Sequence, residues 1–364
     1  MAAAPASFVL KIPESALDDL RERLARTRFP DEPPLEPWST GTSLAYLRDL
    51  VGHWRSGFDW RAHEQTLNGF AQYKVSLAGV DLHFIHQRGG PIPLLLLHGW
   101  PGSVWEFHRL LPRLAAHFTV VAPSLPGFTL SFTPGQRRFG TVEMAEVLVE
   151  LMSLLGYRRF CVQGGDWGAS IATRMGFAHP ERLVGIHLNL LTIPRDPNLV
   201  PATPEETAYL AQLRSFMKDG MGYQWIQGTR PQTLAYGLTD SPAGLLAWIA
   251  EKFRAWSDTP PGRVDLLANT SLYWFTGAIG SSFWPYYARM QQGWPIPDGR
   301  TVDVPAGYAE FPKEILSPPR SLAAKTYTRL QRWTRMEKGG HFAALEQPAA
   351  LAAEIEQFFR PLAG

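Results

Sequence analysis

The residues with the clearest capacity for chemistry lie at 164–168, Gly-Gly-Asp-Trp-Gly, directly after the apolar run Phe-Cys-Val at 160–162. We expect a helix to begin near Ala169, so the segment has the strand, sharp turn and helix that present a nucleophile between small residues. Asp166 holds the nucleophile position. Its carboxylate, kept ionised by the helix N-terminus, can displace a leaving group from a saturated carbon and become an ester. The alternative is a glycine-rich turn in which Asp166 only caps the helix.

A second turn lies earlier in the chain, at 98–103, His-Gly-Trp-Pro-Gly-Ser, after the apolar run at 94–97. Such a turn presents the backbone N–H of Trp100, which together with the N–H of Trp167 would form an oxyanion hole with two donors. A His-Gly pair alone is weak support, but the two motifs in this order reinforce each other. We expect His98 itself to have a structural role in the turn.

The candidate general base is His341, in the segment Gly-Gly-His-Phe at 339–342. It alone among the 10 histidines lies in a glycine-flanked turn after the predicted strands. Enzymes with a nucleophile on a strand-to-helix turn follow the order nucleophile, acid, histidine, which fits this position. The acid that orients His341 should lie between them. Asp303, Glu310 and Glu314 compete for that role, and sequence spacing does not choose among them.

The elements that must position these residues alternate between strands and helices. Strands are predicted at 80–85, 94–97, 120–122, 160–162 and 184–190, and a later one at 302–307. A helix capped by Thr141 and closed by Gly156 separates two of them, and a terminal helix is predicted at 348–359. This alternation is typical of an α/β protein with a mostly parallel sheet that has helices on both faces.

The chain divides into a core and two additions. Residues 1–75 are predicted to wrap around the core, with one helix capped by Ser15 and another over 44–54. Residues 76–195 and 296–364 should form the core. Residues 196–295 break the alternation with helical, aromatic-rich segments, which predicts a helical cap or lid.

Composition excludes several classes of protein. With 364 residues and 45% apolar residues the chain can bury a sizeable core, and a net charge of +2 does not indicate nucleic acid or an anionic membrane as a partner. One cysteine excludes an internal disulfide and a cysteine-rich metal site. No apolar run approaches the roughly 20 residues that span a bilayer, and no secretory signal is evident. We therefore expect a cytoplasmic protein.

Together these motifs resemble those of an epoxide hydrolase of the α/β-hydrolase fold, in the branch of microsomal and juvenile-hormone epoxide hydrolases and their soluble fungal and bacterial relatives. The resemblance rests on segments along nearly the whole chain, namely 24–31, 54–60, 98–103, 123–128, 164–168, 311–314 and 339–342. It implies Asp166 as nucleophile, His341 as base and Glu314 as orienting acid, with Glu310 as second choice.

The resemblance also implies two lid tyrosines that donate hydrogen bonds to the epoxide oxygen. Tyr223 matches the first and Tyr286 the second, although the adjacent Tyr287 leaves that register open. The implied reaction converts an epoxide and water into a vicinal diol through an Asp166 ester, with neither a metal nor an organic cofactor. The oligomeric state stays open, with a homodimer among the options.

The aromatic content of the chain suggests a pocket for bulky, apolar epoxides, since 13 tryptophans are many for this length. Four of them are expected to bind substrate: Trp100, Trp167, Trp225 and Trp284. The nearest rival is a haloalkane or haloacid dehalogenase, because the same three residues can displace halide and Trp167 could bind it. A silent binding protein is disfavoured because every catalytic role is filled, and an esterase because aspartate replaces serine.

Overall fold

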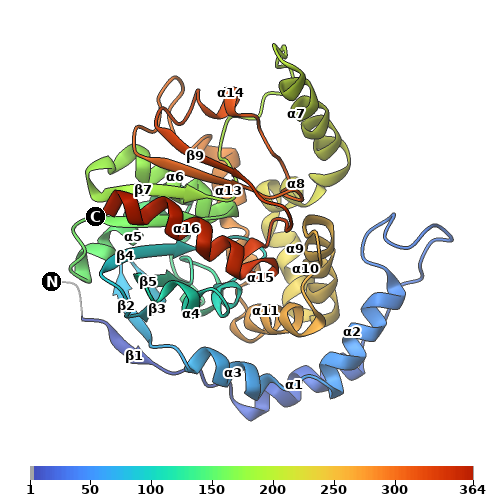
Figure 1. Cartoon of the computed structure of the whole chain (residues 1–364). Coiled ribbons are helices and arrows are strands. Elements are labelled where there is room, and N and C mark those ends of the chain that lie inside the picture. Colours follow the sequence, from blue (N-terminus) through green and yellow to red (C-terminus); the bar gives the residue numbers. More distant parts are fainter. Residues whose placement is uncertain (1–3, 364) are drawn as a thin grey trace.

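The computed structural model describes residues 4–363, and their strands form one sheet (Figure 1). Its nine strands are arranged in the order β1-β2-β3-β5-β4-β6-β7-β8-β9. Strands β4 to β9 are parallel to one another. The other three strands form antiparallel pairs with their neighbours: β1 with β2, β2 with β3, and β3 with β5. The predicted α/β-hydrolase fold is thereby confirmed. The strands are β1 Ala6–Phe8, β2 Gln72–Leu77, β3 Val80–Gln87, β4 Ile92–Leu97, β5 Phe118–Pro123, β6 Phe160–Gly164, β7 Leu183–Leu188, β8 Ala306–Glu310 and β9 Leu330–Arg335.

Helices cover both faces of the sheet, with α4 and α16 on one face and α5 and α6 on the other (Figure 1). A group of helices from α7 to α13 lies beyond the sheet, between β7 and β8 in the chain. The helices are α1 Glu14–Ala25, α2 Leu44–Ser56, α3 Trp60–Asn68, α4 Leu111–Leu114, α5 Thr141–Leu154, α6 Asp166–Ala178, α7 Pro204–Ser215, α8 Gly222–Thr229, α9 Pro231–Asp240, α10 Pro242–Trp256, α11 Arg263–Thr276, α12 Ile279–Ser282, α13 Trp284–Gln292, α14 Arg320–Ala323, α15 Ala343–Glu346 and α16 Pro348–Ala363.

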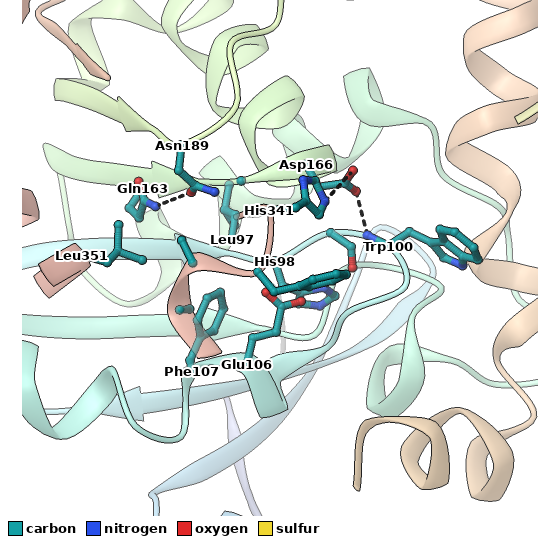
Figure 2. A pocket seen from close by; sticks show the side chains of 15 residues that line it. Leu97, His98, Trp100, Glu106, Phe107, Gln163, Asp166, Asn189, His341 and Leu351 are labelled. Atoms are coloured by element: carbon teal, nitrogen blue, oxygen red, sulfur yellow. Dashed lines mark hydrogen bonds and ion pairs between the residues drawn. The ribbon is translucent and has the colours of Figure 1, made fainter. Parts of the chain in front are cut away.

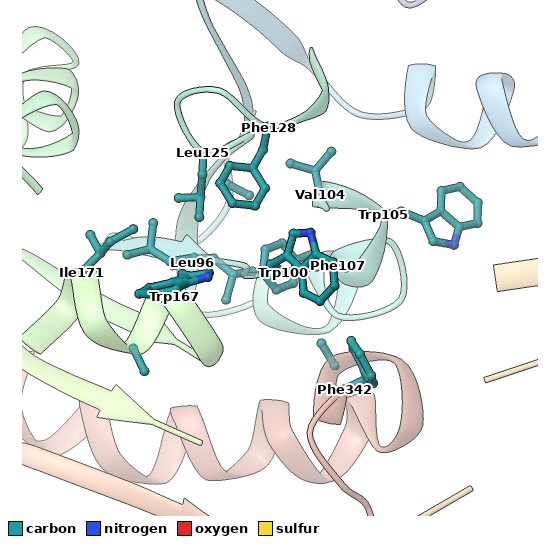
Figure 3. Packing of buried hydrophobic residues seen from close by; sticks show 14 of the residues in the cluster. Leu96, Trp100, Val104, Trp105, Phe107, Leu125, Phe128, Trp167, Ile171 and Phe342 are labelled. Atoms are coloured by element: carbon teal, nitrogen blue, oxygen red, sulfur yellow. The ribbon is translucent and has the colours of Figure 1, made fainter. Parts of the chain in front are cut away.

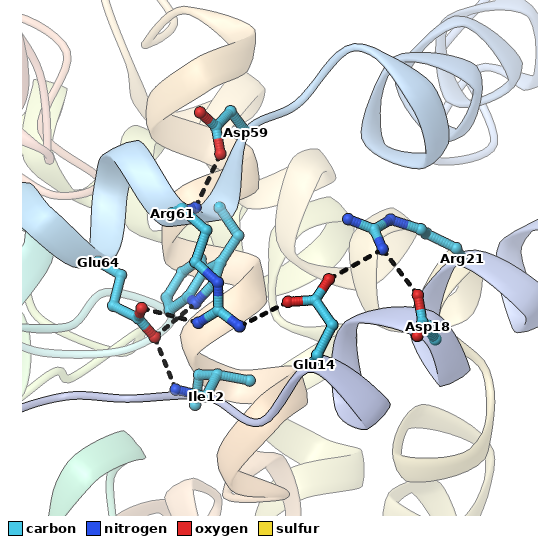
Figure 4. A network of polar contacts seen from close by, with 8 residues as sticks. Ile12, Glu14, Asp18, Arg21, Asp59, Arg61 and Glu64 are labelled. Carbon is cyan, nitrogen blue, oxygen red and sulfur yellow. Dashed lines mark hydrogen bonds and ion pairs between the residues drawn. The ribbon is translucent and has the colours of Figure 1, made fainter.

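The N-terminal elements run along the outside of the other helices, as the blue ribbon in Figure 1 shows. Helices α1 and α2 contact α10, and α3 contacts α11. The buried carboxylate of Glu64 ties this segment together, because it accepts hydrogen bonds from Ile12 N–H at 2.6 Å, Trp60 Nε1 at 3.1 Å and Arg61 at 2.8 Å (Figure 4). These contacts hold the N-terminal elements together, and the division into a wrapping segment (1–75), a core (76–195 and 296–364) and a lid (196–295) stays our prediction.

Several predicted boundaries are wrong. Ser15 does not cap α1, which begins at Glu14 after Pro13 and has no side-chain cap. Thr141 is the first residue of α5, where Glu143 accepts a hydrogen bond from the N–H of Gly140 instead.

Two further boundaries shift near the site. Helix α6 begins at Asp166 and not near Ala169, and β8 occupies Ala306–Glu310 whereas 302–307 was predicted. Val302 makes only an isolated bridge to Tyr327. Among the described helices, none combines the length and the apolar character needed to cross a membrane.

Candidate active site

The turn that carries Asp166 follows directly from the packing of β6 and α6. Asp166 has φ +46°, a left-handed conformation that costs a residue with a side chain about 1–3 kcal/mol. A Cβ on Gly164 would lie 2.4 Å from the backbone of Gly168, and a Cβ on Gly168 would lie 2.3 Å from the carbonyl oxygen of Leu97. Only glycine fits at both positions, so the motif brings the helix N-terminus tightly against the ends of two strands.

Two turns meet at the Asp166 carboxylate because β4 and β6 are neighbours, with Leu97 paired to Gly164. The N–H of Trp100, in the turn after β4, donates to Asp166 Oδ1 at 2.7 Å. The other oxygen, Oδ2, lies 3.5 Å from His341 Nε2. Figure 2 shows Asp166 between these two groups. The N–H of Trp167 belongs to the first turn of α6, where backbone N–H groups have no acceptor within the helix.

His341 is held from its other side by Glu314. The Nδ1–H of His341 donates to Glu314 Oε1 at 2.6 Å, and the same oxygen accepts from the N–H of Ile315 at 2.7 Å. Burial by itself lowers the pKa of His341, but the charge of Glu314 and the hydrogen bonds to Asp166 and Glu314 outweigh it. The pKa of His341 is therefore raised well above its ordinary value, and the ring is directed with Nε2 toward Asp166.

The two other acids proposed from the sequence have different partners. Glu310, at the end of β8, accepts hydrogen bonds from Trp333 Nε1 at 2.8 Å and from Arg335 Nε at 3.2 Å. Asp303 accepts a hydrogen bond from the hydroxyl of Thr328 at 2.7 Å. Glu314 is thus the acid that the structure brings to His341.

Tyr223 from α8 and Tyr286 from α13 face Asp166 from the lid. Both line one cavity with Asp166, and the ring of Trp100 stacks on Tyr223 at 5.4 Å and meets Tyr286 edge-on at 5.8 Å. The Tyr223 hydroxyl accepts a hydrogen bond from Gln224 at 2.8 Å, which leaves its proton free to be donated. The Tyr286 hydroxyl is buried and makes no hydrogen bond of regular geometry among the described residues, although the Tyr223 hydroxyl and the Trp167 indole N–H lie close enough to affect its pKa.

Both phenols are kept protonated by their surroundings. Burial is the main cause of the raised pKa of Tyr223, and the charge of Asp166 adds to it. Burial likewise raises the pKa of Tyr286, with contributions from Tyr223 and Asp166. Tyr287 does not line the cavity and packs against Trp284 with the ring centroids 4.9 Å apart. The structure therefore directs Tyr286, and not its neighbour, toward Asp166.

Asp166 separates two cavities of different character. On the lid side a cavity of about 230 Å³ is lined by Asp166, Trp167, both tyrosines and mostly apolar side chains such as Leu191. On the other side a cavity of about 20 Å³ is lined by Asp166, His341, Glu106 and neighbouring residues. The same carboxylate is thus accessible from a larger apolar space and from a small polar one.

The tryptophans predicted to bind substrate differ in their placement. Trp167 lines the larger cavity and Trp100 the smaller one, and Figure 3 shows both rings packed among buried apolar residues. Trp225 has half of its surface exposed and does not line the cavity, and Trp284 is turned toward Tyr287. Neither Trp225 nor Trp284 therefore lines the cavity beside Asp166.

His98 lies in the turn as a structural residue would. Its Nε2 accepts a hydrogen bond from the N–H of Leu125 at 3.1 Å, which places the ring proton on Nδ1, next to the carbonyl of Gly99 at 3.0 Å. Burial lowers its pKa to about 4, so the ring is neutral. The imidazole thereby ties the turn after β4 to the loop after β5.

Three charged residues at the cavities escaped the sequence analysis: Glu106, Arg195 and Arg289. Glu106 lines the small cavity, and its pKa is raised to about 8 mainly by burial; the charge of His341 opposes this shift and the charge of Asp166 adds to it. A charged residue inside the apolar run 104–107 was a signal that could have revealed it. Arg195 and Arg289 line the larger cavity, and no local pattern marks either of them. No group of three or more His, Cys, Asp or Glu side chains within residues 4–363 is arranged to hold a metal ion.

Comparison with known proteins places this arrangement in a family. Residues 5–107 match the epoxide hydrolase N terminus family, and residues 92–274 match the alpha/beta hydrolase fold family. A protein from Stigmatella aurantiaca is 42% identical over 98% of this chain and 84% of its own length. Epoxide hydrolase 1 from Oryctolagus cuniculus is 34% identical over 96% of this chain and 88% of its own length.

Solved structures agree with the sequence relatives over nearly the full chain. The Aspergillus niger epoxide hydrolase superposes with a TM-score of 0.88 at 32% identity, covering 99% of this chain and 97% of that one. The juvenile hormone epoxide hydrolase of Bombyx mori gives 0.89 at 30% identity, covering 99% and 95%. The chain therefore belongs to the epoxide hydrolase family of the α/β-hydrolase fold.

Proposed function

We propose that this enzyme converts epoxides into vicinal diols through a covalent ester on Asp166. The observation that carries the proposal is the position of the Asp166 carboxylate between two phenols on the lid side and the His341–Glu314 pair on the core side. One carboxylate thereby reaches both an electrophile and a water molecule without any movement of the core.

In the first half-reaction an Asp166 oxygen attacks an epoxide carbon in the larger cavity. A carbon–oxygen bond to Asp166 forms as the carbon–oxygen bond of the strained ring breaks, and the released alkoxide takes a proton from Tyr223 or Tyr286. Neutral phenols can donate that proton, and their raised pKa values ensure that both are protonated near pH 7. A substrate oxygen would give the Tyr286 hydroxyl a well-aligned hydrogen bond that no described residue provides in the resting enzyme.

In the second half-reaction water attacks the ester carbonyl of Asp166. The cavity of about 20 Å³ beside His341 has room for one water, which needs about 10–15 Å³ in this measure. His341 Nε2 takes a proton from that water, and Glu106 supplies a second polar partner. The N–H groups of Trp100 and Trp167 stabilise the tetrahedral oxyanion. Its collapse restores the carboxylate and expels the diol oxygen, which takes the proton held by His341, and the second proton of the water returns to the tyrosine that opened the epoxide.

The charge of Asp166 links the two half-reactions. In the resting enzyme the carboxylate helps to raise the pKa of His341. Alkylation converts the carboxylate into a neutral ester, so this contribution disappears and the pKa of His341 falls. A larger fraction of the imidazole is then neutral and able to accept a proton at the step that requires a base.

One observation also favours dehalogenation as a second candidate. The buried indole Nε1 of Trp167 makes no hydrogen bond of regular geometry with the described residues and lies beside Tyr286 in the cavity lining, where an N–H could bind halide. The two phenols favour an epoxide instead, because halide leaves without needing a proton. A panel of epoxides and haloalkanes tested with the purified protein distinguishes the two activities.

The covalent route is tested by a single turnover in water enriched in heavy oxygen. We expect the label to enter Asp166 and to be absent from the first diol formed, with Asp166→Asn yielding no diol. His341→Ala should accumulate a protein whose mass is increased by one substrate molecule. Heavy oxygen found directly in the first diol would show that water attacks the epoxide itself and would refute the ester.

A further inference from the structure

The larger cavity contains two positive charges that the reaction does not use. Arg195 follows β7, and Arg289 lies on α13. Within residues 4–363, neither guanidinium lies within ion-pair distance of a carboxylate. Arg195 is exposed to solvent at the edge of the cavity, whereas Arg289 is partly buried, and a partly buried cation in largely apolar surroundings usually has a partner.

Arg289 is held close to the proposed reacting groups. It follows Tyr286 by three residues on α13, so the two side chains lie on the same face of the helix, separated by a rise of about 4.5 Å. The centre of the guanidinium lies 3.7 Å from the ring centroid of Trp294, which also lines the cavity. The aromatic contact orients the guanidinium but leaves its charge without a counter-ion.

The positive charges also affect each other. Burial lowers the pKa of Arg289 to about 9, and the nearby charge of Arg195 contributes to that change. Arg289 therefore stays cationic near pH 7, in unfavourable proximity to a second cation. The nearby carboxylates are already engaged: Asp166 accepts a hydrogen bond from Trp100, and Asp196 accepts one from the N–H of Asn198 and lines a neighbouring cavity.

We propose that the substrate of this enzyme is an epoxide that also carries a carboxylate, which Arg195 and Arg289 bind while the epoxide lies against Tyr223 and Tyr286. Guanidinium groups match a carboxylate in shape and charge. They would also offset the repulsion that the Asp166 carboxylate exerts on an anionic substrate. This inference rests on the proposed epoxide hydrolysis, and it replaces the expectation of bulky, wholly apolar epoxides.

The volume of the cavity limits the chain length of the epoxy acid that can bind. Its volume of about 230 Å³ is below the roughly 300–1,000 Å³ of typical small-molecule sites, so a short acid fits better than a long one. Arg289 lies one helical turn from Tyr286, which places the carboxylate only a few carbons from the epoxide. We therefore expect short terminal epoxy acids to react best.

The test compares terminal epoxy acids, from 4,5-epoxypentanoate to 10,11-epoxyundecanoate, with their methyl esters. For the wild-type enzyme we expect kcat/KM to be higher for the acid than for its ester in the short members. Arg289→Met and Arg195→Met should each lower the acid-to-ester ratio about 10- to 100-fold, the loss typical of one hydrogen bond to a charged group. Arg289→Lys should retain part of the preference, because it keeps the charge and loses the planar fork.

A matched control and a binding measurement complete the experiment. Arg48 also stacks on an aromatic ring, that of Phe29 at 4.6 Å, but it lies on α2 outside the cavity. Arg48→Met should leave the acid-to-ester ratio unchanged. Hexanoate should inhibit hydrolysis of styrene oxide by the wild-type enzyme more strongly than methyl hexanoate does, and each cavity variant should lose this difference.

Two negative outcomes have different meanings. If the wild-type enzyme hydrolyses styrene oxide or the esters but prefers no acid, the carboxylate site is refuted while epoxide hydrolysis stands. If it opens no epoxide at all, the proposed function itself fails. An equal fall of acid and ester rates in both cavity variants would also refute the site, because it would indicate a structural role for the arginines.

Discussion

Removal of the Tyr286 hydroxyl should lower the rate of epoxide opening without lowering the stability of the protein. Tyr286 lines the cavity with Asp166, and its buried hydroxyl makes no hydrogen bond of regular geometry among the described residues. Tyr286→Phe should therefore remove a donor to the epoxide oxygen while breaking only poorly aligned contacts with Tyr223 and Trp167 in the resting enzyme. Loss of one preorganised donor of this kind costs about 10²–10³ in rate, or roughly 2.7–4 kcal/mol of transition-state stabilisation.

The stability of the Tyr286→Phe protein should not fall together with its activity. A buried polar group without a well-aligned partner costs up to about 1–3 kcal/mol, so loss of the weak contacts with Tyr223 and Trp167 should be offset and the phenylalanine variant should be about as stable as the wild-type protein. Tyr287→Phe is the matched control, because Tyr287 is adjacent in sequence and packs against Trp284 outside the cavity. We expect that control to retain activity within about threefold of the wild type, as expected for a hydroxyl outside the site.

The assay is a single-turnover measurement of epoxide opening by tryptophan fluorescence, together with diol analysis and thermal unfolding. The fluorescence should respond because the ring of Trp167 lies 4.7 Å from that of Tyr286. Tyr286→Phe activity close to that of the wild type, or a large loss in Tyr287→Phe instead, would contradict the assignment. A clear fall in unfolding temperature for Tyr286→Phe would show that the hydroxyl has a partner in the resting enzyme.

Three other predictions concern the base, the nucleophile turn and the N-terminal segment. Glu314→Gln should lower kcat by up to about 10⁴ and move the acidic limb of the pH–rate profile to lower pH, since the lost carboxylate no longer raises the pKa of His341; an unmoved limb would argue against the pairing. Gly168→Ala should destabilise the protein by about 1–3 kcal/mol in urea unfolding and abolish activity, because its Cβ would meet backbone. As a control, Gly52→Ala in α2 would have no atom within 4 Å of its Cβ, and it should instead increase the free energy of unfolding by about 1 kcal/mol. Glu64→Ala should cost about 1–3 kcal/mol and expose the N-terminal segment to limited proteolysis, and unchanged protease resistance would count against its role.

Much of the core could be predicted because its signals are local. Buried parallel strands have few polar residues, so β4 and β6 appear in the sequence as short, nearly continuous apolar runs. Strand β9 has the sequence Leu-Gln-Arg-Trp-Thr-Arg and lies at the sheet edge, where polar side chains reach solvent, and for that reason it was not predicted. The start of α6 was misplaced because an aspartate with positive φ is not expected to begin a helix.

The sequence by itself determined the kinds of reacting group and their order along the chain, since strand, glycine-flanked turn and helix are specified within a few residues. It also determined the family, through motifs spread from the N-terminus to His341. Only the tertiary structure decided which side chains meet. Glu314 faces His341 whereas Glu310 pairs with Arg335, and successive helix residues point about 100° apart, so Tyr286 faces the cavity and Tyr287 does not. The convergence of Arg195 and Arg289 on one cavity likewise depends on packing between a loop and a helix far apart in the chain, which no local pattern encodes.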